Sequence, residues 1–327
     1  MVQAEHSQLS KVAERLPEWG SPVAVERRLQ RWLSNPRWSL ELCWKAWVKW
    51  LLSSFDSEQW VLLVDETHLG THLSVMMVGL AYQSRCIPLY WRCYLPTAYP
   101  AEGQVKLIGE MLTRLASWIP AQKRPLLEAD RGIGTSPDLI HAVEGVGWRY
   151  LFRVQNSTKL VTRSGQTRAL HTLVRPGESW RGQGIVFKQR GRIRAHVCVL
   201  WRGNQIEPWC LVTNDPLVLG GGYAMRVWQE EGFRDLKSGG WQWQRSQVWL
   251  PAHAERLILT LALAYAWVLT QGTLVFASSP EWRRRISRGR KRRYSLFRES
   301  LRHLRQAVCF PLRVYPGLFF APDKLLC

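Results

Sequence analysis

Residues Tyr223–Lys237, YAMRVWQEEGFRDLK, carry four polar side chains around which the rest of the chain can be interpreted. Tyr223, Arg226, Glu230 and Lys237 stand at offsets 0, 3, 7 and 14. On a helix that turns by about 100° per residue, these offsets fall at roughly 0°, 300°, 340° and 320°. We therefore expect one helix with a phenol, a guanidinium, a carboxylate and an ammonium on a single stripe. A solvated face with ion pairs between neighbouring turns would show the same spacing.

The chain is strongly basic along its whole length. It has 327 residues, with 45 Lys and Arg against 25 Asp and Glu, and a formal net charge of +20 at pH 7. A hydrophobic content of 46% excludes a disordered chain, and this length can bury a sizeable core. The charge predicts a polyanionic partner. Nucleic acid is favoured over a membrane, because no lipidation motif or basic amphipathic segment accompanies the charge.

Cysteine usage and apolar runs predict a cytoplasmic protein. The seven cysteines are scattered and form no C-x-x-C pair, so we expect reduced thiols and no zinc site. The segment MVQAEHSQLSKVAERLP contains acids and no apolar run, which predicts no secretory signal. Residues 257–276 are long enough to span a membrane and carry no charge. Because they contain three threonines, Gln271 and Gly272, we expect a buried core helix.

Two apolar runs upstream of residues Tyr223–Lys237 each lead to an aspartate. Trp60–Val64 precedes Asp65, and Pro125–Ala129 precedes Asp130. A buried strand that ends in a carboxylate is a usual way for α/β proteins to present active-site groups. Around these runs the patterns predict strands near 73–82, 86–94 and 148–154 and helices near 103–117 and 137–144. The expected order is therefore strand, strand, strand, helix, strand, helix, strand.

Together these motifs resemble the DDE transposases of bacterial insertion sequences, in particular the YREK group, the insertion-sequence family numbered four. The pattern Y-x2-R-x3-E-x6-K is complete, and VLLVDET and LLEADRG resemble the two aspartate motifs of that family. The resemblance implies an α/β fold with a ribonuclease-H-like catalytic core, a β-rich insertion and a small helical domain before it. The implied boundaries are a DNA-binding helical region at 1–55, a catalytic domain at 56–327, an insertion at about 155–215 and a basic helical segment at about 280–327.

The resemblance implies that Asp65, Asp130 and Glu230 are the catalytic acids and hold two Mg²⁺ ions, which Mn²⁺ can replace. Carboxylate oxygens suit such hard cations. A pair of metal ions can activate the attacking oxygen and stabilise the leaving oxygen in a displacement at phosphorus. We expect Asp65 to bridge both ions. The neighbouring acids are interpreted as non-ligands; they are Glu66, Glu128, Glu231 and Asp235.

Tyr223, Arg226 and Lys237 are expected to contact DNA phosphates on either side of the scissile bond, with Arg226 as a bidentate donor. Further phosphate contacts are expected from the arginines at 27–37 and from the basic runs at 283–285 and 288–293. In relatives an aromatic residue of the insertion stacks on a flipped base. The candidates for that role here are Trp180, Trp201 and Trp209.

These expectations combine into a transposase. It would bind the terminal inverted repeats of an insertion sequence, cleave the element ends and join the 3′ ends to target DNA. The resemblance implies double-stranded DNA as the partner, a homodimer in the synaptic complex and a place in the bacterial cytoplasm at the nucleoid. Two alternatives stay open: a catalytically inactive DNA-binding relative, such as a transposition inhibitor or a domesticated protein, and another metal-dependent nuclease on the same core.

Overall fold

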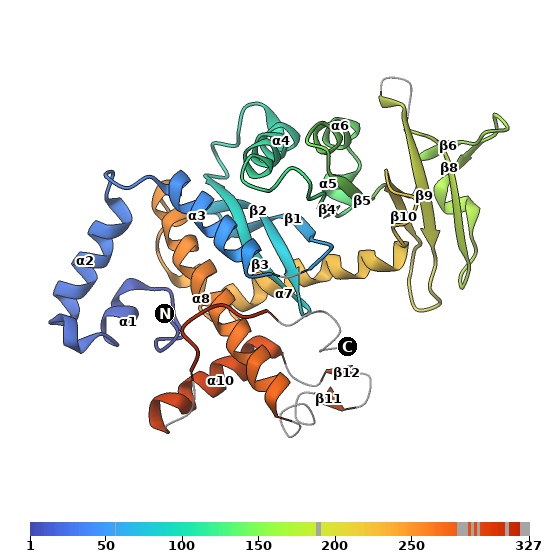
Figure 1. Cartoon of the computed structure of the whole chain (residues 1–327). Helices are drawn as coiled ribbons and strands as arrows, with labels where there is room; N and C mark the ends of the chain where they lie inside the picture. Colours follow the sequence, from blue (N-terminus) through green and yellow to red (C-terminus); the bar gives the residue numbers. More distant parts are fainter. Residues whose placement is uncertain are drawn as a thin grey trace.

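The chain is a mixed α/β protein built on one large mixed sheet, which confirms the expected α/β class (Figure 1). The sheet has ten strands in the order β3-β2-β1-β4-β5-β10-β9-β8-β6-β7. The computed structural model describes residues 1–55, 57–187, 191–279, 287–288, 291–292, 295–310 and 314–320. The basic runs at 283–285 and 288–293 therefore lie mostly outside the described residues, and no side chain of these runs is described.

One half of the sheet carries the two aspartate motifs. β1 (Val61–Leu69), β2 (Leu73–Tyr82) and β3 (Arg85–Tyr94) form an antiparallel meander. β4 (Leu126–Ala129) runs parallel to β1, and β5 (Arg149–Arg153) runs parallel to β4. Every residue of β2 is buried, because this central strand is covered on both faces. The element order expected from the sequence for this half is present, with one short helix, α5 (Arg131–Gly134), added after β4.

Helices cover both faces of this half (Figure 1). α4 (Gly103–Ala116) and α6 (Pro137–Gly145) pack against each other on one face. α7 (Val227–Leu236) packs on β1, β2 and β3 from the opposite face. A side chain on Gly232 of α7 would meet the backbone oxygen of Cys86 at 2.8 Å, so glycine lets this helix lie close to β3.

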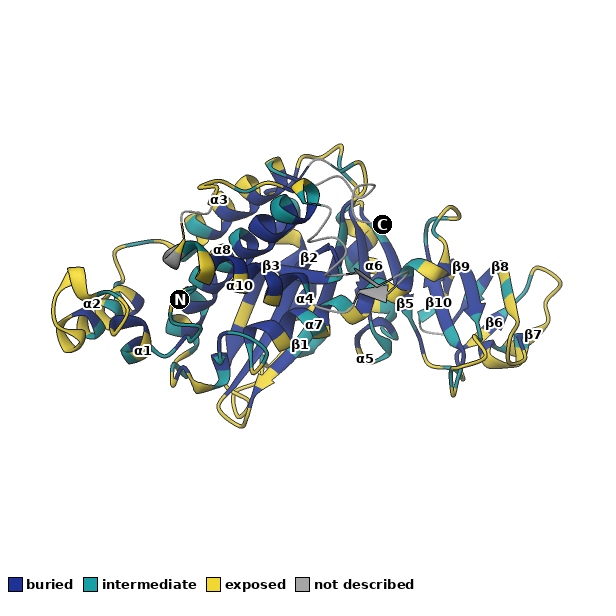
Figure 2. Ribbon diagram, turned by 90° about the horizontal axis from the view of Figure 1, so that it is seen from below, coloured by how far each residue is buried: buried dark blue, intermediate teal, exposed yellow. Residues whose placement is uncertain are grey.

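The first helices are α1 (Leu9–Ala13), α2 (Pro22–Ser34) and α3 (Leu40–Ser53). The side chains of Ser21 and Ser39 cap the amino ends of α2 and α3. α3 packs on the sheet, where Trp47 Nε1 donates to the backbone oxygen of Pro88 at 3.0 Å. α2 is mostly exposed and lies at the end of the molecule away from the strands β6–β9 (Figure 2).

The long apolar segment forms α8 (Pro251–Ser278), which contacts β3 and α10 (Leu296–Cys309). Among the described residues it is the one helix long and apolar enough to cross a membrane, and 67% of its most apolar window is buried inside the chain. A Cβ at Gly272 would lie 1.7 Å from Ser300 Oγ, so glycine permits the close approach of α10. The apolar composition of α8 therefore serves packing within the chain.

The other half of the sheet is a run of antiparallel strands: β6 (Lys159–Val161), β7 (Thr167–Ala169), β8 (Ser179–Val186), β9 (Ile193–Leu200) and β10 (Trp209–Thr213). β10 also pairs with β5, so both halves share one sheet. β8 pairs with β9 along its whole length, from Ser179 opposite Leu200 to Val186 opposite Ile193. The strands β6 and β7 were not predicted, since three residues are too few to show alternation.

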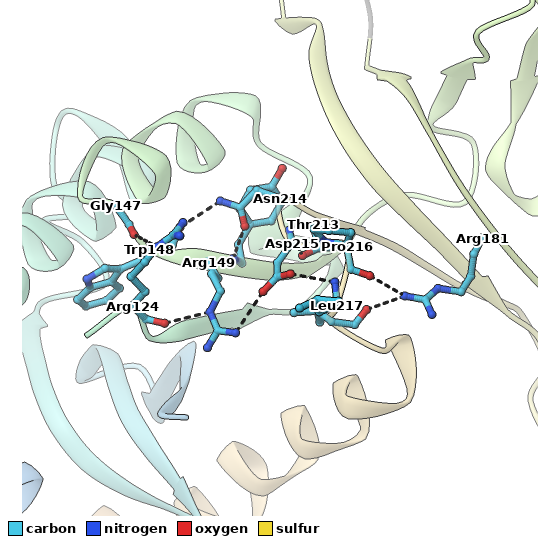
Figure 3. Close-up of polar contacts among 12 residues, drawn as sticks. Arg124, Gly147, Trp148, Arg149, Arg181, Thr213, Asn214, Asp215, Pro216 and Leu217 are labelled. Carbon is cyan, nitrogen blue, oxygen red and sulfur yellow. Dashed lines mark hydrogen bonds and ion pairs between the residues drawn. The ribbon is translucent and has the colours of Figure 1, made fainter. Parts of the chain in front are cut away.

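A polar network joins the end of β10 to β5 and to the segment before β4 (Figure 3). Asn214 accepts from the backbone N–H of Tyr150 and donates to the backbone oxygen of Trp148, each at 3.1 Å. Arg149 pairs with Asp215 at 3.2 Å. These contacts hold β10 against β5 at the carboxyl end of β10.

Candidate active site

The signature segment forms two helices in place of the one continuous helix predicted. Residues Gly220–Arg226 are a 3₁₀ helix, Val227–Leu236 are α7, and Lys237 has left the helix with φ −87° and ψ −130°. The three glycines at 220–222 explain the first break, because glycine is a poor α-helix former. The prediction of a single stripe was therefore wrong, although the tertiary structure still brings its residues to one region.

Arg226 is the centre of that region. Its side chain is 7% exposed, and Nη2 lies 2.9 Å from Asp65 Oδ2 and 3.8 Å from Asp130 Oδ2. Nη1 lies 3.6 Å from Glu230 Oε1. All three predicted catalytic acids thus converge on one guanidinium. The terminal nitrogens of Arg226, which we expected to face a phosphate, face carboxylates.

The two aspartates meet because their strands are parallel neighbours. The register pairs Val64 with Ala129, so Asp65 and Asp130 are the next residues on adjacent strands. We had expected Asp65 at the end of its strand, but the strand does not end there. β1 continues to Leu69, because it goes on pairing with β2 after the pairing with β4 has ended.

Asp130 and Glu230 each lie at the amino end of a helix, and the helix fixes their position. Asp130 caps α5 and accepts from the backbone N–H of Ile133 at 3.0 Å, which leaves Oδ2 turned toward Arg226. Glu230 is in the first turn of α7, four residues after Arg226 and therefore on the same side of the helix. The side chains of Asp130 and Glu230 are 41% and 63% exposed, whereas Asp65 is 17% exposed. The site thus opens to solvent at two of its three acids.

The cluster holds more negative than positive charge. Burial raises the pKa of Asp65 to about 6; Arg226 opposes this shift, and Asp130 and Glu230 add to it. Among the described residues, no three His, Cys, Asp or Glu side chains stand close enough together to hold a metal ion. The donor chemistry still fits hard divalent cations, since three carboxylates share one guanidinium and two of them are open to solvent.

Tyr223 and Lys237 lie on opposite sides of the cluster. Tyr223 is 5% exposed and packs among Leu126, Leu151 and Leu211, so it supports the site from within the core. Burial raises the pKa of its phenol above the ordinary value. Lys237 Nζ donates to Thr67 Oγ1 at 2.6 Å and to a backbone oxygen of β1 at 2.8 Å. Burial lowers the pKa of Lys237, and Asp65 opposes that shift.

Three of the acids interpreted as non-ligands have other partners. Asp235 pairs with Arg85 at 2.5 Å and accepts from Tyr265 at 2.9 Å. Glu231 pairs with Arg234 at 2.9 Å. Glu66, on the opposite face of β1 from Asp65, accepts from Tyr94 and from Gln104. Buried Gln229 of α7 accepts from the thiol of Cys86 at 2.8 Å, which anchors the helix to β3.

Glu128 has an environment that the sequence analysis missed. It is fully buried, and within the described part of the chain neither carboxylate oxygen has a hydrogen-bond partner. Burial raises its pKa to about 8, and Arg226 opposes the shift. Side chains alternate along a strand, so Glu128 faces the same side of the sheet as Asp130, two residues later. That alternation was a signal available in the sequence.

Trp209 is the candidate tryptophan that touches the signature segment. Its ring meets Tyr223 edge to face at 5.1 Å, and the Arg202 guanidinium lies 5.3 Å from its ring centre. Trp180 covers Gly182, where a Cβ would lie 2.4 Å from the ring. Trp201 Nε1 donates to a backbone oxygen within its own loop at 3.1 Å. Nothing in the sequence distinguishes the three, because the difference lies in tertiary packing.

Exposed arginines form basic surfaces away from the acid cluster. On α2 and the loop after it, all the arginines expected to contact DNA are exposed, namely Arg27, Arg28, Arg31 and Arg37. Arg302 and Arg305 of α10 are also exposed and pair with Glu299 and Glu5. The α2 arginines make no ion pair with any acid in the described ranges.

Comparison with known proteins shows no family for this chain. No family model matches it, and no curated protein matches it significantly. Among solved structures, the crystal structure of human ENDOV is similar with a TM-score of 0.28 and 13% identity, over 68% of this chain and 96% of that chain. A likeness of this size supports no conclusion about activity, so the case for function depends on the residues of the site.

Proposed function

We propose that this chain is a DDE transposase of the YREK group. Its active site, which cuts and joins DNA, would be formed by Asp65, Asp130 and Glu230. The observation that carries the proposal is the convergence of these three acids, from two adjacent strands and one helix, within 4 Å of Arg226. The spacing of the signature and the two aspartate motifs led to the same three residues. A net charge of +20 supports a nucleic-acid partner.

The proposal includes a ribonuclease-H-like core with an insertion. Its support is the strand order β3-β2-β1-β4-β5, with the first acid on β1 and the second directly after β4. The strands β6–β10 would then be the β-rich insertion between β5 and the signature segment. Double-stranded DNA, a homodimer in the synaptic complex and a place in the bacterial cytoplasm at the nucleoid belong to the same proposal.

Asp65, Asp130 and Glu230 would hold two Mg²⁺ ions, or Mn²⁺ in their place. Bound there, such ions would supply Lewis-acid stabilisation of charge at the phosphate and a more acidic attacking hydroxyl. Asp65, with a pKa of about 6, is mostly ionised at pH 7 and above and so can serve as a ligand. Arg226 offsets part of the repulsion among the three carboxylates.

Lys237 and Trp209 would position the DNA. Two of the three N–H groups of Lys237 are used by β1, and the third, which has no partner within the described ranges, could donate to a phosphate oxygen. Trp209 lies beside Tyr223 at the insertion side of the cluster, where an unstacked base could lie against its ring. Tyr223 is buried and contacts the ring of Trp209, so it would hold Trp209 in place.

A DNA-binding protein without catalysis is the second candidate. It is favoured by the same guanidinium, since Arg226 lies at the centre of the acids and compensates part of their charge from within the chain. The exposed arginines of α2 would serve such a protein equally well. The two candidates differ in whether DNA is cut.

The deciding experiment is cleavage of a labelled duplex that carries the ends of the element encoding this chain, with Mg²⁺ or with EDTA. Nicking at the element boundary that requires Mg²⁺ and is lost in Glu230→Gln would support the transposase. The matched control is Glu231→Gln, which removes the adjacent acid, and this variant should cut normally. Binding of the ends without cutting in Mg²⁺ or Mn²⁺ would favour the inactive protein. Cutting that survives Glu230→Gln would contradict the proposed third acid.

A further inference from the structure

Next to Asp130, one carboxylate of the insertion is enclosed by three donors. Glu207 lies in the loop between β9 and β10. It accepts hydrogen bonds from Arg131 Nη1 at 2.8 and 3.0 Å, from Arg153 Nη2 at 2.5 Å and from Asn156 Nδ2 at 2.7 Å. Both carboxylate oxygens are therefore held, and two of the donors are guanidinium groups.

These donors adjoin the acid cluster. The register of β4 and β5 pairs Ala129 with Phe152, so the next residues, Asp130 and Arg153, lie side by side on the same face of the sheet. Arg131 follows Asp130 directly in the chain. Arg153 and Asn156 thus lie one strand beyond Asp130, on the side away from β1, and Arg131 reaches them from the start of α5.

The group of donors carries more positive charge than Glu207 neutralises. Partial burial acts to raise the pKa of Glu207, but Arg153 and Arg131, together with hydrogen bonds from Arg131 and Asn156, bring it below the ordinary value. Arg153 Nε is buried and, among the described residues, has no hydrogen-bond partner. One carboxylate faces two guanidinium groups, so the site keeps one positive charge that Glu207 does not neutralise.

The carboxylate is also placed where it can leave. The side chains of Glu207 and Arg131 are 40% and 39% exposed, and the preceding residue, Ile206, is 98% exposed and anchors nothing in the core. Ion pairs at such exposure contribute little to stability because water and salt compete for both partners. Withdrawal of Glu207 would expose the three donors without disturbing the buried sheet.

We propose that Arg131, Arg153 and Asn156 form a binding site for a backbone phosphate of duplex DNA, and that Glu207 fills this site until DNA displaces it. A phosphodiester presents two oxygen acceptors and one negative charge, as a carboxylate does, and can accept from the same donors. The inference rests on the proposed function, because it takes DNA as the polyanion that reaches the acid cluster. Glu207 then acts as an internal competitor that weakens binding to every DNA sequence alike.

The test is binding of a fluorescein-labelled duplex of arbitrary sequence and about 30 base pairs, followed by anisotropy in EDTA at several salt concentrations. Glu207→Gln keeps the size of the side chain and removes its charge, so this variant should bind about fivefold more tightly than the wild type. Glu144→Gln, at an exposed position near the carboxyl end of α6, makes the same change in net charge at a residue that contacts none of the three donors, and it should bind as the wild type does. Equal gains in both variants would show a general charge effect and overturn the inference.

A second substitution tests whether the gain in DNA affinity arises at the three donors. Adding Arg131→Gln to Glu207→Gln should return the affinity to the wild-type level and reduce the salt slope by about one. Arg131 is partly exposed, so its loss should leave the melting temperature almost unchanged. A gain that persists in the double variant would contradict the assignment of these donors.

The outcomes separate this inference from the proposed function. If the wild type binds and cuts DNA but Glu207→Gln binds no more tightly, the inference alone fails. If neither protein binds DNA, both fail. Tighter binding by Glu207→Gln in EDTA, cancelled by Arg131→Gln, supports the phosphate site whether or not the chain cuts DNA.

Discussion

Two neighbouring clusters of this protein have inverse compositions. Around Arg226, three carboxylates share one guanidinium, which is buried. Around Glu207, two guanidinium groups and an amide share one carboxylate, which is 40% exposed. The first cluster lacks positive charge and the second lacks negative charge. Side by side along the sheet, they suit a ligand that brings cations to one and an anionic group to the other, as a metal-bound nucleic acid would.

From the comparison of the two clusters, we expect the largest change in stability when Arg226, the buried residue at the centre of the acids, is replaced. Arg226→Gln should lower the free energy of unfolding at pH 7 by about 3–5 kcal/mol, because the largely buried Asp65 loses its partner at 2.9 Å and is left near Asp130 and Glu230 without a compensating charge. Urea unfolding measures this loss. The control is Arg234→Gln, whose side chain is 65% exposed, with an expected change within about 0.5 kcal/mol. A similar small change in Arg226→Gln would mean that the acids are well solvated, and the contrast between the clusters would fail.

The dependence of stability on pH tests whether the buried carboxyl group of Glu128 is protonated in the folded protein. Its folded-state pKa of about 8 lies above the ordinary 4.5, so the folded state binds a proton between these values that the unfolded state has released. The wild type should therefore lose stability as pH rises from 5 to 8, by at most about 1.4 kcal/mol per pH unit. Glu128→Gln removes this contribution and should become more stable relative to the wild type over the same window.

Urea unfolding of the wild type and Glu128→Gln at pH 5, 6, 7 and 8 would give the difference directly. The expected trend comes from one group only, so the comparison uses the difference between the two proteins and not the slope of either. A constant difference across the series would show that Glu128 titrates in the folded protein as it does in water, and that Arg226 stabilises its charge.

The smallest expected effect is at the exposed cluster. Glu207→Gln should change the free energy of unfolding by less than about 1 kcal/mol, because a half-exposed ion pair is screened by water and salt. Thermal or urea unfolding at two salt concentrations measures it. A loss of several kcal/mol would show that Glu207 is a structural support, and its exchange for a phosphate would then be too costly.

Local patterns in the sequence were enough to predict the strands β1–β5 and the aspartates that follow two buried runs, but not β6 and β7. WVLLV before Asp65 and PLLEA before Asp130 are buried runs, and burial on both faces of a parallel sheet produces such runs. The pairing of the two acids then follows from the strand order. Alternation would also have revealed Glu128, since it puts residues 126, 128 and 130 on one face.

The form of the signature segment could not be predicted by the same means. Helical offsets assume one regular helix, whereas the glycines at 220–222 give a 3₁₀ turn before α7. The sequence spacing of these residues also shows which of them share one side of a helix, but it does not show which part of the protein that side contacts. The burial of Arg226 among acids and the contact of Trp209 with Tyr223 depend on how β4, β10 and α7 meet in space. The Glu207 cluster joins residues more than fifty positions apart and leaves no local pattern.

The pairing of β5 with β10 has a mechanical consequence. Backbone hydrogen bonds tie these strands edge to edge, and Asn214 adds two further links at their end. The outer strands β6–β9 thus form an arm that continues the core sheet through β10. A load applied to its far end, for example by a bent duplex, would be transmitted through the sheet to β4 and Asp130. Tension on the arm and the geometry of the acids would then change together.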